Sequence, residues 1–465
     1  MKNLLNMKKN LVGVITAIIL TTTVLAGCGT EKKEETGGTK TTAPVATNAP
    51  KAKKVKDGIK PFTVSLRHIN VRDTQKKTLA MLQDVVDKTL KDVPGLKIEM
   101  DGVEDTVNRD TKLKAEMAAG NQPNIFNLFG GDDTINYAKA GRLLPLNDIL
   151  AKLNLSDQFF DLREFTVDGK IYGLPEAGYV EGFYYNKKLF ANAGITAPPT
   201  TWDGFLADCA ALKAKGITPI AMGGGAGDAW VINMLFNSLF VGLGGPELQE
   251  GFAKGTGQWT DPKIVDAFAK LKDLKDKGFI DTNVLGLKYA EGQAKFYTAQ
   301  AAMLFDGSWA TSAIVDPTKS TMAADAGFFR FPNISGAGDG LINGGWSNGY
   351  GFSSVQTPDQ LAAIEAFINN FYNPAMQTRQ LIDDNRIPSM KGVSDITGAQ
   401  PLVAEIGKQQ ASATKAYPAF DALVQAKVKA VVESTVQELL GGKLTPDKAA
   451  ETIQKVQDLA NKAQK

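Results

Sequence analysis

Five segments of this chain place aromatic residues next to glycines and polar residues. They are FGGDD (129–133), EAGYVEGFYYNK (176–187), GDAW (227–230), DGSW (306–309) and GGWSNGY (344–350). Flat aromatic rings fit the apolar faces of sugar rings, and planar polar side chains fit sugar hydroxyls, when both line a cleft. Trp230, Trp309 and Trp346 lie in these segments, whereas Trp202 and Trp259 lie at predicted helix starts, where packing is expected. The pattern favours carbohydrate binding.

Other chemistries find weaker support in the sequence. GWSNG (345–349) matches the serine-hydrolase pattern G-x-S-x-G, but its flanks predict strands on both sides and the single histidine, His68, lies upstream. One histidine and the lack of C-x-x-C argue against a zinc site, and the phosphate-binding G-x-x-x-x-G-K-[ST] is missing. We expect no cofactor. A glycosidase needs only two carboxylates and stays an alternative.

The elements that must position these segments alternate between helix and strand. Helical spacing of apolar residues predicts helices over 110–120, 201–216, 260–278 and 357–374, and apolar runs predict strands over 124–129 and 301–309. This alternation indicates an α/β fold with largely parallel sheets flanked by helices, whose ligands lie at the carboxyl ends of strands. A length of 465 residues predicts two domains.

The charge balance gives no reason to expect nucleic acid as a partner. The chain has 52 basic and 50 acidic residues, and its first 27 residues contain three lysines and no acid, so the remainder is nearly neutral. There are two cysteines. Cys209 shares the apolar face of the predicted helix 201–216, so we expect it to be buried in a core.

The N-terminus has the order of a secretory signal. Three lysines within residues 1–10 precede the apolar run LVGVITAIIL (11–20), and small residues then precede Cys28 in LAGC. This resembles the lipobox of bacterial lipoproteins, which implies that residues 1–27 are removed and Cys28 carries a lipid. An uncleaved anchor helix is the alternative. Residues 28–58 are rich in Thr, Lys, Ala, Pro and Gly and predict a flexible tether.

Five longer segments come in the order found in one family. They are KLKAEMAAGNQPNIFNL (112–128), GRLLPLNDIL (141–150), the stretch from DGKIYGLPEAGY to TPIAMG (168–223), KFYTAQAAMLFDGSWA (295–310) and GGKLTPDKAAETIQK (441–455). From about residue 60 to its end the chain resembles the extracellular solute-binding proteins of the large carbohydrate-binding family, similar in plan to the maltose-binding protein. Asn124 stands where that family usually has Asp.

The resemblance implies two α/β lobes joined by a multi-strand hinge, with a mono- or oligosaccharide held between them. The lobes are expected at 59–178 with 350–397, and at 179–349 with 398–465. It also implies partners: the membrane permease of an ATP-binding cassette importer, and the outer face of the cell membrane through the lipid on Cys28. We expect a monomer that is not an enzyme.

Ligand contacts implied by the resemblance begin at the first crossing between the lobes and at the end of a first-lobe strand. Tyr179 stands where the maltose receptor has a ligand-contacting acid. Phe129 and Asp132 fall near a stacking aromatic residue and a hydroxyl-binding acid of that receptor. Core packing is the alternative for Phe129, and helix capping is the alternative for Asp132; Asp133 could fill either role.

Further candidates come from the strand ends. Trp309, after MLFDG, resembles the family's stacking tryptophan, and Trp230 stands similarly after a glycine-rich loop. Trp346 lies where the chain should cross between lobes, so it is expected to line either the hinge or a core.

Charged candidates are fewer. Arg67 and His68 end the first predicted strand, FTVSLRH, whose end faces the cleft in this family. Glu181 and Arg386 are weaker candidates that structural ion pairs would equally explain. A receptor for a charged solute, such as a peptide or a phosphate ester, would need arginine forks or helix N-termini. The candidate segments hold aromatic and acidic residues instead, which favours a sugar.

Overall fold

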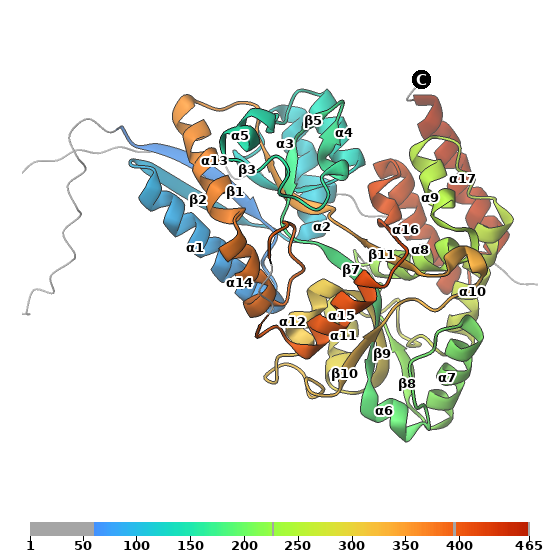
Figure 1. Cartoon of the computed structure of the whole chain (residues 1–465). Helices are drawn as coiled ribbons and strands as arrows, with labels where there is room; N and C mark the ends of the chain where they lie inside the picture. Colours follow the sequence, from blue (N-terminus) through green and yellow to red (C-terminus); the bar gives the residue numbers. More distant parts are fainter. Residues whose placement is uncertain (1–59, 226, 394–396, 464–465) are drawn as a thin grey trace, which may run out of the picture. The chain divides into compact units, whose positions relative to one another are not determined.

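The computed structural model describes residues 60–225, 227–393 and 397–463. The predicted signal, Cys28 and the tether 28–58 lie outside these residues. None of the helices formed by the described residues has both the length and the apolar character needed to cross a membrane. Figure 1 shows two sheets surrounded by helices. We call the body around the five-stranded sheet the first lobe and the body around the six-stranded sheet the second lobe.

The first lobe is built on a sheet with strand order β2-β1-β3-β12-β6. Its strands are β1 (Phe62–His68), β2 (Leu96–Gly102), β3 (Ile125–Phe129), β6 (Gly173–Pro175) and β12 (Asn348–Phe352). Its helices are α1 (Lys76–Asp92), α2 (Asp105–Val107), α3 (Leu113–Ala119), α4 (Asp132–Lys139), α5 (Asn147–Lys152), α13 (Pro358–Phe371) and α14 (Pro374–Asp384). A π-helical turn, Asn108–Lys112, joins α2 to α3, and β4 (Thr166–Val167) pairs with β5 (Lys170–Ile171).

The second lobe is built on a sheet with strand order β13-β11-β7-β9-β8, with β10 paired to β7. Its strands are β7 (Tyr179–Asn186), β8 (Thr218–Ala221), β9 (Ala301–Gly307), β10 (Ala326–Phe329), β11 (Leu341–Gly345) and β13 (Lys415–Tyr417). Its helices are α6 (Lys187–Asn192), α7 (Trp202–Ala214), α8 (Trp230–Gly244), α9 (Pro246–Ala253), α10 (Pro262–Asp276), α11 (Tyr289–Tyr297), α12 (Thr311–Ile314), α15 (Pro401–Ala411), α16 (Ala426–Leu440) and α17 (Pro446–Ala463).

The predicted helix starts at Thr201 and Thr357 are confirmed by their caps. At α13 the Thr357 side chain accepts a hydrogen bond from the backbone N–H of Gln360, and the Gln360 side chain accepts one from Thr357. Pro358 follows in the first turn, where its missing N–H leaves no bond unmade. At α7 the Thr201 side chain accepts a hydrogen bond from the backbone N–H of Gly204, and Cys209 on that helix is fully buried, as expected.

Both sheets mix parallel and antiparallel pairs. Strand pairs β1-β2, β1-β3, β8-β9 and β11-β13 are parallel, and every antiparallel pair of the two sheets includes β7 or β12. These two strands directly follow the short segments 176–178 and 346–347, where the chain passes from one sheet to the other. A strand that enters a sheet from the other lobe runs against its new neighbours, which explains the departure from purely parallel order.

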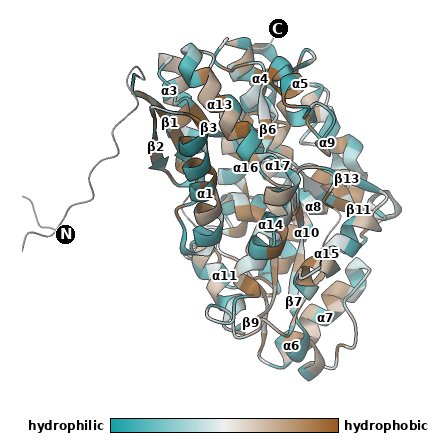
Figure 2. Ribbon diagram, turned by 60° about the vertical axis from the view of Figure 1, so that its left-hand side comes forward, coloured by the Kyte–Doolittle hydropathy of each residue, from teal (hydrophilic) through white to brown (hydrophobic). Residues whose placement is uncertain are grey.

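Each lobe has a core of its own. Residues such as Val64, Leu82 and Phe367 pack around the first sheet, whereas Phe183 and Leu235 belong to a separate cluster around the second. Figure 2 shows α1 as a mixture of hydrophilic and hydrophobic residues, as expected for a helix with one face on a sheet and one in water. The space between the two cores is therefore free to hold a ligand site.

Candidate functional site

A cavity of about 220 Å³ lies where residues of both lobes meet. The first lobe contributes the segment after β1, including Ile69, Asn70 and Arg72, and the second lobe contributes α8, α11 and the segment 308–312. The chain segment 176–181, which crosses between the sheets, also lines it. The cavity thus lies beside the carboxyl end of β1 and at the crossing, as the α/β pattern predicts.

One wall of the cavity is aromatic. Trp309 keeps 40% of its surface exposed, although its neighbours are buried. Its ring centroid lies 5.9 Å from that of Tyr179 and 6.4 Å from that of Trp230, and Trp230 lies 4.7 Å from Tyr289. All four residues line the cavity. An exposed ring on a wall of fixed aromatic residues offers the flat apolar surface that a sugar ring needs.

Trp309 is held in place from behind. Its Nε1 donates a hydrogen bond of 2.9 Å to the Tyr289 hydroxyl, which in turn donates to the Asp306 carboxylate at 3.0 Å. Gln293 Nε2 also donates to Asp306, at 2.9 Å. Burial raises the pKa of Asp306 to about 6, although these hydrogen bonds work in the opposite direction. A side chain fixed in this way loses little entropy when a ligand binds.

Gly307 allows the Trp309 ring to lie directly against the backbone. A Cβ atom at residue 307 would come within 2.2 Å of the Trp309 ring, which is far inside van der Waals contact. Any other residue here would push the ring away from the wall. The glycine of DGSW therefore positions the tryptophan two residues after it.

Two asparagines on α8 were missed by the sequence reasoning. Asn233 and Asn237 line the cavity and are 4% and 1% exposed. Neither the donor nor the acceptor atom of either side-chain amide has a hydrogen-bond partner among the described residues. Two amides four residues apart in the largely apolar segment WVINMLFNSLF would have been the signal, because buried polar groups are almost always paired.

Each arginine that lines the cavity is paired with a carboxylate. Arg386 Nη1 lies 2.9 Å from Glu176 Oε1, Arg109 Nη1 lies 3.4 Å from Asp421 Oδ2, and Arg72 is paired with Glu104. Each arginine lines the cavity with its charge already balanced by a carboxylate.

Glu181 also lines the cavity and is buried, at 3% exposure. One of its oxygens accepts a hydrogen bond from Asn343 Nδ2. Burial raises its pKa well above the usual value, and the nearby Asp421 and Asp306 add to this effect. The protonated carboxyl group that burial favours is a hydrogen-bond donor as well as an acceptor.

Phe129, Asp132 and Asp133 lie at a second, smaller cavity between the lobes. Phe129 lines both cavities and carries the Arg109 guanidinium 4.4 Å above its ring. Asp132 and Asp133 begin α4 and line only the smaller cavity, where Asp132 accepts hydrogen bonds from Asn136 Nδ2 at 2.8 Å and from the backbone of Ala426. The structure thus places the two acids beside the large cavity and not in its wall.

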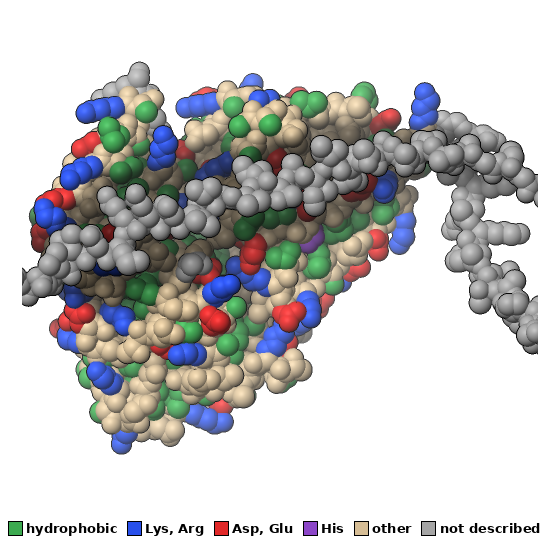
Figure 3. All heavy atoms as spheres, turned by 180° about the vertical axis from the view of Figure 1, so that it is seen from behind, with side chains coloured by type: hydrophobic (Ala, Val, Ile, Leu, Met, Phe, Trp, Pro, Cys, Tyr) green, Lys and Arg blue, Asp and Glu red, His purple; other side chains and the backbone are tan. Residues whose placement is uncertain are grey.

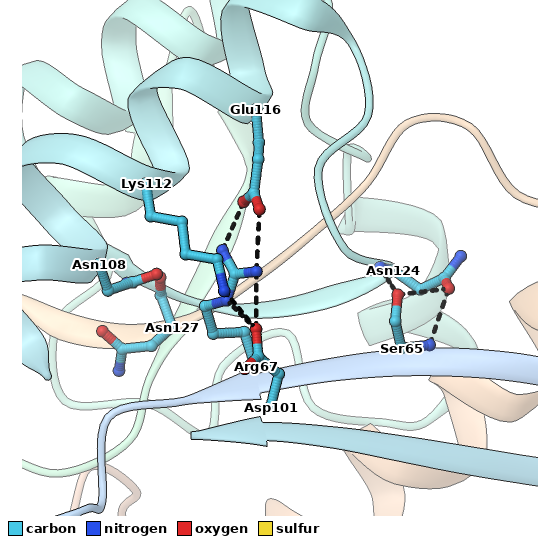
Figure 4. Close-up of polar contacts among 8 residues, drawn as sticks. All are labelled: Ser65, Arg67, Asp101, Asn108, Lys112, Glu116, Asn124 and Asn127. Carbon is cyan, nitrogen blue, oxygen red and sulfur yellow. Dashed lines mark hydrogen bonds and ion pairs between the residues drawn. The ribbon is translucent and has the colours of Figure 1, made fainter. Parts of the chain in front are cut away.

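Arg67 and His68 are turned to structural contacts in the first lobe. Arg67 is 4% exposed and binds Asp101 at 2.8 Å and Glu116 at 2.9 Å, as Figure 4 shows. Lys112 reaches the same Asp101 carboxylate. His68 Nδ1 accepts a hydrogen bond of 3.2 Å from the backbone of Asn70, and burial lowers its pKa. Neither residue is in the wall of the large cavity.

Trp346 lies at the crossing between β11 and β12. Its ring stacks on Phe160 with centroids 5.8 Å apart, and its Nε1 donates to the Pro388 carbonyl at 3.4 Å. The wall of the large cavity does not include it. The next residue, Ser347, has a strand on either side, as predicted, and its hydroxyl lies 3.3 Å from the Tyr179 hydroxyl.

Trp202 and Trp259 pack in the second core, as expected from their places at helix starts. Trp259 is fully buried, and its Nε1 donates to Gln457 at 3.1 Å. Among the described residues there is also no group of three or more His, Cys, Asp or Glu side chains arranged to hold a metal ion.

Comparison with known proteins gives one consistent result. Residues 74–378 match the family described as bacterial extracellular solute-binding protein. A multiple sugar-binding protein of Streptococcus mutans is 25% identical over 84% of this chain and 86% of its own length. A solved structure described as a chitin oligosaccharide binding protein is 68% identical, covers 86% of this chain and 99% of that chain, and superposes with a TM-score of 0.85.

A maltose-bound structure, MalE3 of T. maritima, shares the fold with a TM-score of 0.68 at 19% identity, covering 86% of this chain and 99% of that chain. The family match spans more than half of the chain, and the two-lobed α/β architecture agrees with it. The chain therefore belongs to the family of bacterial extracellular solute-binding proteins, which are binding proteins and not enzymes.

Proposed function

We propose that this protein captures an oligosaccharide in the cavity between its two lobes and delivers it to the permease of an ATP-binding cassette importer. The observation that carries the proposal is the cavity wall itself, in which the exposed Trp309 ring stands on a fixed aromatic support. The relative from Streptococcus mutans is described as binding multiple sugars, and the 68% identical structure as binding chitin oligosaccharides. We take chitin oligosaccharides as the ligand class.

The charge of the cavity supports an uncharged ligand. The three arginines described above are neutralised by Glu176, Asp421 and Glu104, so none offers a free fork to a carboxylate or a phosphate. On the visible part of the face in Figure 3, acidic and basic side chains alternate without a region of one sign. A receptor for an anionic solute would need an unbalanced positive wall.

The lobes are proposed at 59–178 with 350–397 and at 179–349 with 398–465. The buried clusters support these bounds: the first core contains Val64 to Leu174 and Tyr350 to Met390, and the second contains residues from Val180 to Ile342 and from Leu402 to Ile453. The segments 176–178 and 346–347 would then act as the hinge about which the lobes close on the ligand.

Placement at the membrane is also a proposal. The lipobox-like LAGC supports a lipid on Cys28, with residues 28–58 as a tether to the outer face of the cell membrane. We expect the lipidated protein to be a monomer when it meets the permease.

The ligand class is tested by thermal shift and calorimetry of the purified protein with chitin, cello- and malto-oligosaccharides of equal length. A ligand present at about 100 times its dissociation constant adds about 2.7 kcal/mol of apparent stability. We expect the chitin series to raise the unfolding temperature most. If every oligosaccharide leaves both the melting curve and the heat of mixing unchanged, the proposed function is wrong.

A further inference from the structure

The cavity-facing side of α8 contains polar groups that the protein itself leaves unpaired. Of all described residues, Asn233 and Asn237 are the two with both side-chain polar atoms buried and without a hydrogen-bond partner. Leaving a buried amide unpaired destabilises the folded chain, because the group has lost its hydrogen bonds to water without gaining others. Two of them on one helix point to a partner that comes from outside the chain.

The spacing of the two amides places them on one side of the helix. Residues four apart in a helix lie one above the other, so Asn233 and Asn237 face the same region, with Met234 beside them and Trp230 one turn earlier. All four line the cavity. Met234 is 6% exposed and adds a polarizable apolar side chain to the part of the cavity wall that contains the two amides.

We propose that the α8 face formed by Asn233, Met234 and Asn237 recognises the 2-acetamido group of a sugar residue, an inference that rests on the proposed function. An acetamido group offers one N–H donor, one carbonyl acceptor and one methyl group. Asparagine Oδ1 accepts from the N–H, Nδ2 donates to the carbonyl, and the methyl group packs on Met234. A plain hydroxyl would pair with an amide but would leave Met234 without an apolar partner.

The surroundings of this face agree with a neutral amide ligand. Trp230 begins α8 and belongs to the aromatic wall, so a sugar ring stacked there brings its substituents towards Asn233 and Asn237. Ser238, the next residue along, is turned away from the cavity and lies 3.4 Å from the Tyr417 hydroxyl. The polar atoms of this helix thus divide into a paired set on the core side and an unpaired set on the cavity side.

The test compares Asn233→Leu and Asn237→Leu with the parent and with the control Ser238→Ala. Leucine keeps the branched shape of asparagine without its polar atoms. Calorimetry measures binding of a chitin oligosaccharide, the same oligomer without acetyl groups, and a cello-oligosaccharide of equal length. We expect the parent to prefer the acetylated sugar, and each Asn→Leu change to weaken that binding about tenfold or more. Binding of the other two sugars should change much less.

Stability provides the second readout. Removing an unpaired buried amide should leave the ligand-free variant at least as resistant to urea as the parent, whereas loss of a structural asparagine would lower its resistance. Should leucine prove too large for the site, Asn→Ala at the same positions gives the same comparison of sugars.

The outcomes separate this inference from the proposed function. If the parent prefers the acetylated sugar and both Asn→Leu variants keep that preference, the α8 face is not the acetamido site, while the proposed function stands. If the parent binds the three sugars equally, both this inference and the chitin ligand class are overturned, although sugar binding survives. If no sugar binds, the proposed function itself fails.

Discussion

Trp309 differs from the buried tryptophan Trp259 in how much of its ring the protein leaves uncovered. Truncating an aromatic anchor of a binding site commonly costs more than about 2 kcal/mol, or roughly 30-fold in affinity. We therefore expect Trp309→Ala to bind chitin oligosaccharide at least that much more weakly while unfolding at nearly the same urea concentration, because 40% of the residue is already exposed.

Trp259→Ala is the matched control for Trp309→Ala. Its ring is fully buried and hydrogen-bonded to Gln457, so its loss should cost about 3–5 kcal/mol of stability and leave the affinity of the folded fraction unchanged. Calorimetry and urea melts on both variants decide the matter. A Trp309→Ala protein that melts early and binds normally would move Trp309 from the site to the core.

The buried carboxyl group of Glu164 should make the stability of the protein depend on pH. Its Oε2 is buried without a partner, and burial raises its pKa to about 7. Between the usual pKa of a glutamate and about 7, the folded chain holds a proton that the unfolded chain has released, so the free energy of unfolding falls as pH rises through this window. Each unit of pKa shift corresponds to about 1.4 kcal/mol.

Glu164→Gln should remove this contribution. Urea melts at about pH 5 and about pH 8 should show a smaller loss of stability in the variant than in the parent. Part of the pH dependence of stability should remain in the variant, because burial also raises the pKa values of Asp306 and Glu181. Glu99→Gln, at a side chain that is 57% exposed, is the control. Equal slopes in parent and Glu164→Gln would show that Glu164 titrates normally in the folded chain.

At the residue scale, more of the predicted aromatic residues than of the predicted polar residues line the large cavity. Tryptophans beside glycines stand out in a sequence, and both Trp309 and Trp230 do line the cavity. Asp132 and Asp133 were placed by analogy alone, and the structure puts them in the wall of the smaller cavity. Asn233 and Asn237 were not predicted, because the sequence does not show whether an asparagine in an apolar helix is buried without a hydrogen-bond partner.

At the scale of elements, helix ends were predictable and strand neighbours were not. The capping box formed by Thr357 and Gln360 spans only four residues, so the local sequence is enough to predict the start of α13. The pairing of β12 with β3, in contrast, joins residues more than 200 positions apart. The ion pairs of Arg67 could not be predicted for the same reason, because its partners Asp101 and Glu116 come from elements distant in sequence.

Contacts between elements of the two lobes predict an effect of salt on binding. Lys429 on α16 is 8% exposed and lies 3.0 Å from Asp110 in the π-helical turn of the first lobe. Burial acts to raise the pKa of Asp110, but the charges of Arg109 and Lys429 outweigh it and hold that pKa below its usual value. Because the pair joins the lobes without lining the large cavity, it should favour the closed arrangement without touching the ligand.

We expect Lys429→Met to weaken binding of the uncharged sugar by roughly three- to tenfold and to make that affinity less sensitive to salt between about 0.05 and 0.5 M. Lys254→Met removes the same charge from an exposed pair with Glu250 at the C-terminal end of α9 and serves as the control. The measurement is calorimetry at both salt concentrations. Equal behaviour of the two variants would show that the Lys429 pair does not assist closure.

At the scale of the whole molecule, the role proposed for the N-terminal segment rests on its sequence alone. The two lobes, their separate cores and the cavity between them need only the residues from about Phe62 onwards. A receptor of this kind serves a permease only if it stays near the membrane. The proposed lipid on Cys28 of LAGC and the proposed tether 28–58 would keep it there.

The last prediction therefore concerns Cys28. Cys28→Ala should release the protein from membranes or leave its N-terminal segment uncleaved, because the lipid would be attached to the Cys28 thiol. Membrane and soluble fractions of cells that produce parent and variant are compared by immunoblot, and the N-terminal residue is read by mass spectrometry. Cys209→Ala is the matched control: it removes the chain's other thiol from the core of the second lobe, which should cost about 1 kcal/mol of stability and leave the protein at the membrane. A Cys28→Ala protein that is cleaved and retained like the parent would contradict the lipid anchor and favour a protein partner as the means of attachment. A parent protein that keeps its N-terminal residues at the membrane would favour the uncleaved anchor helix.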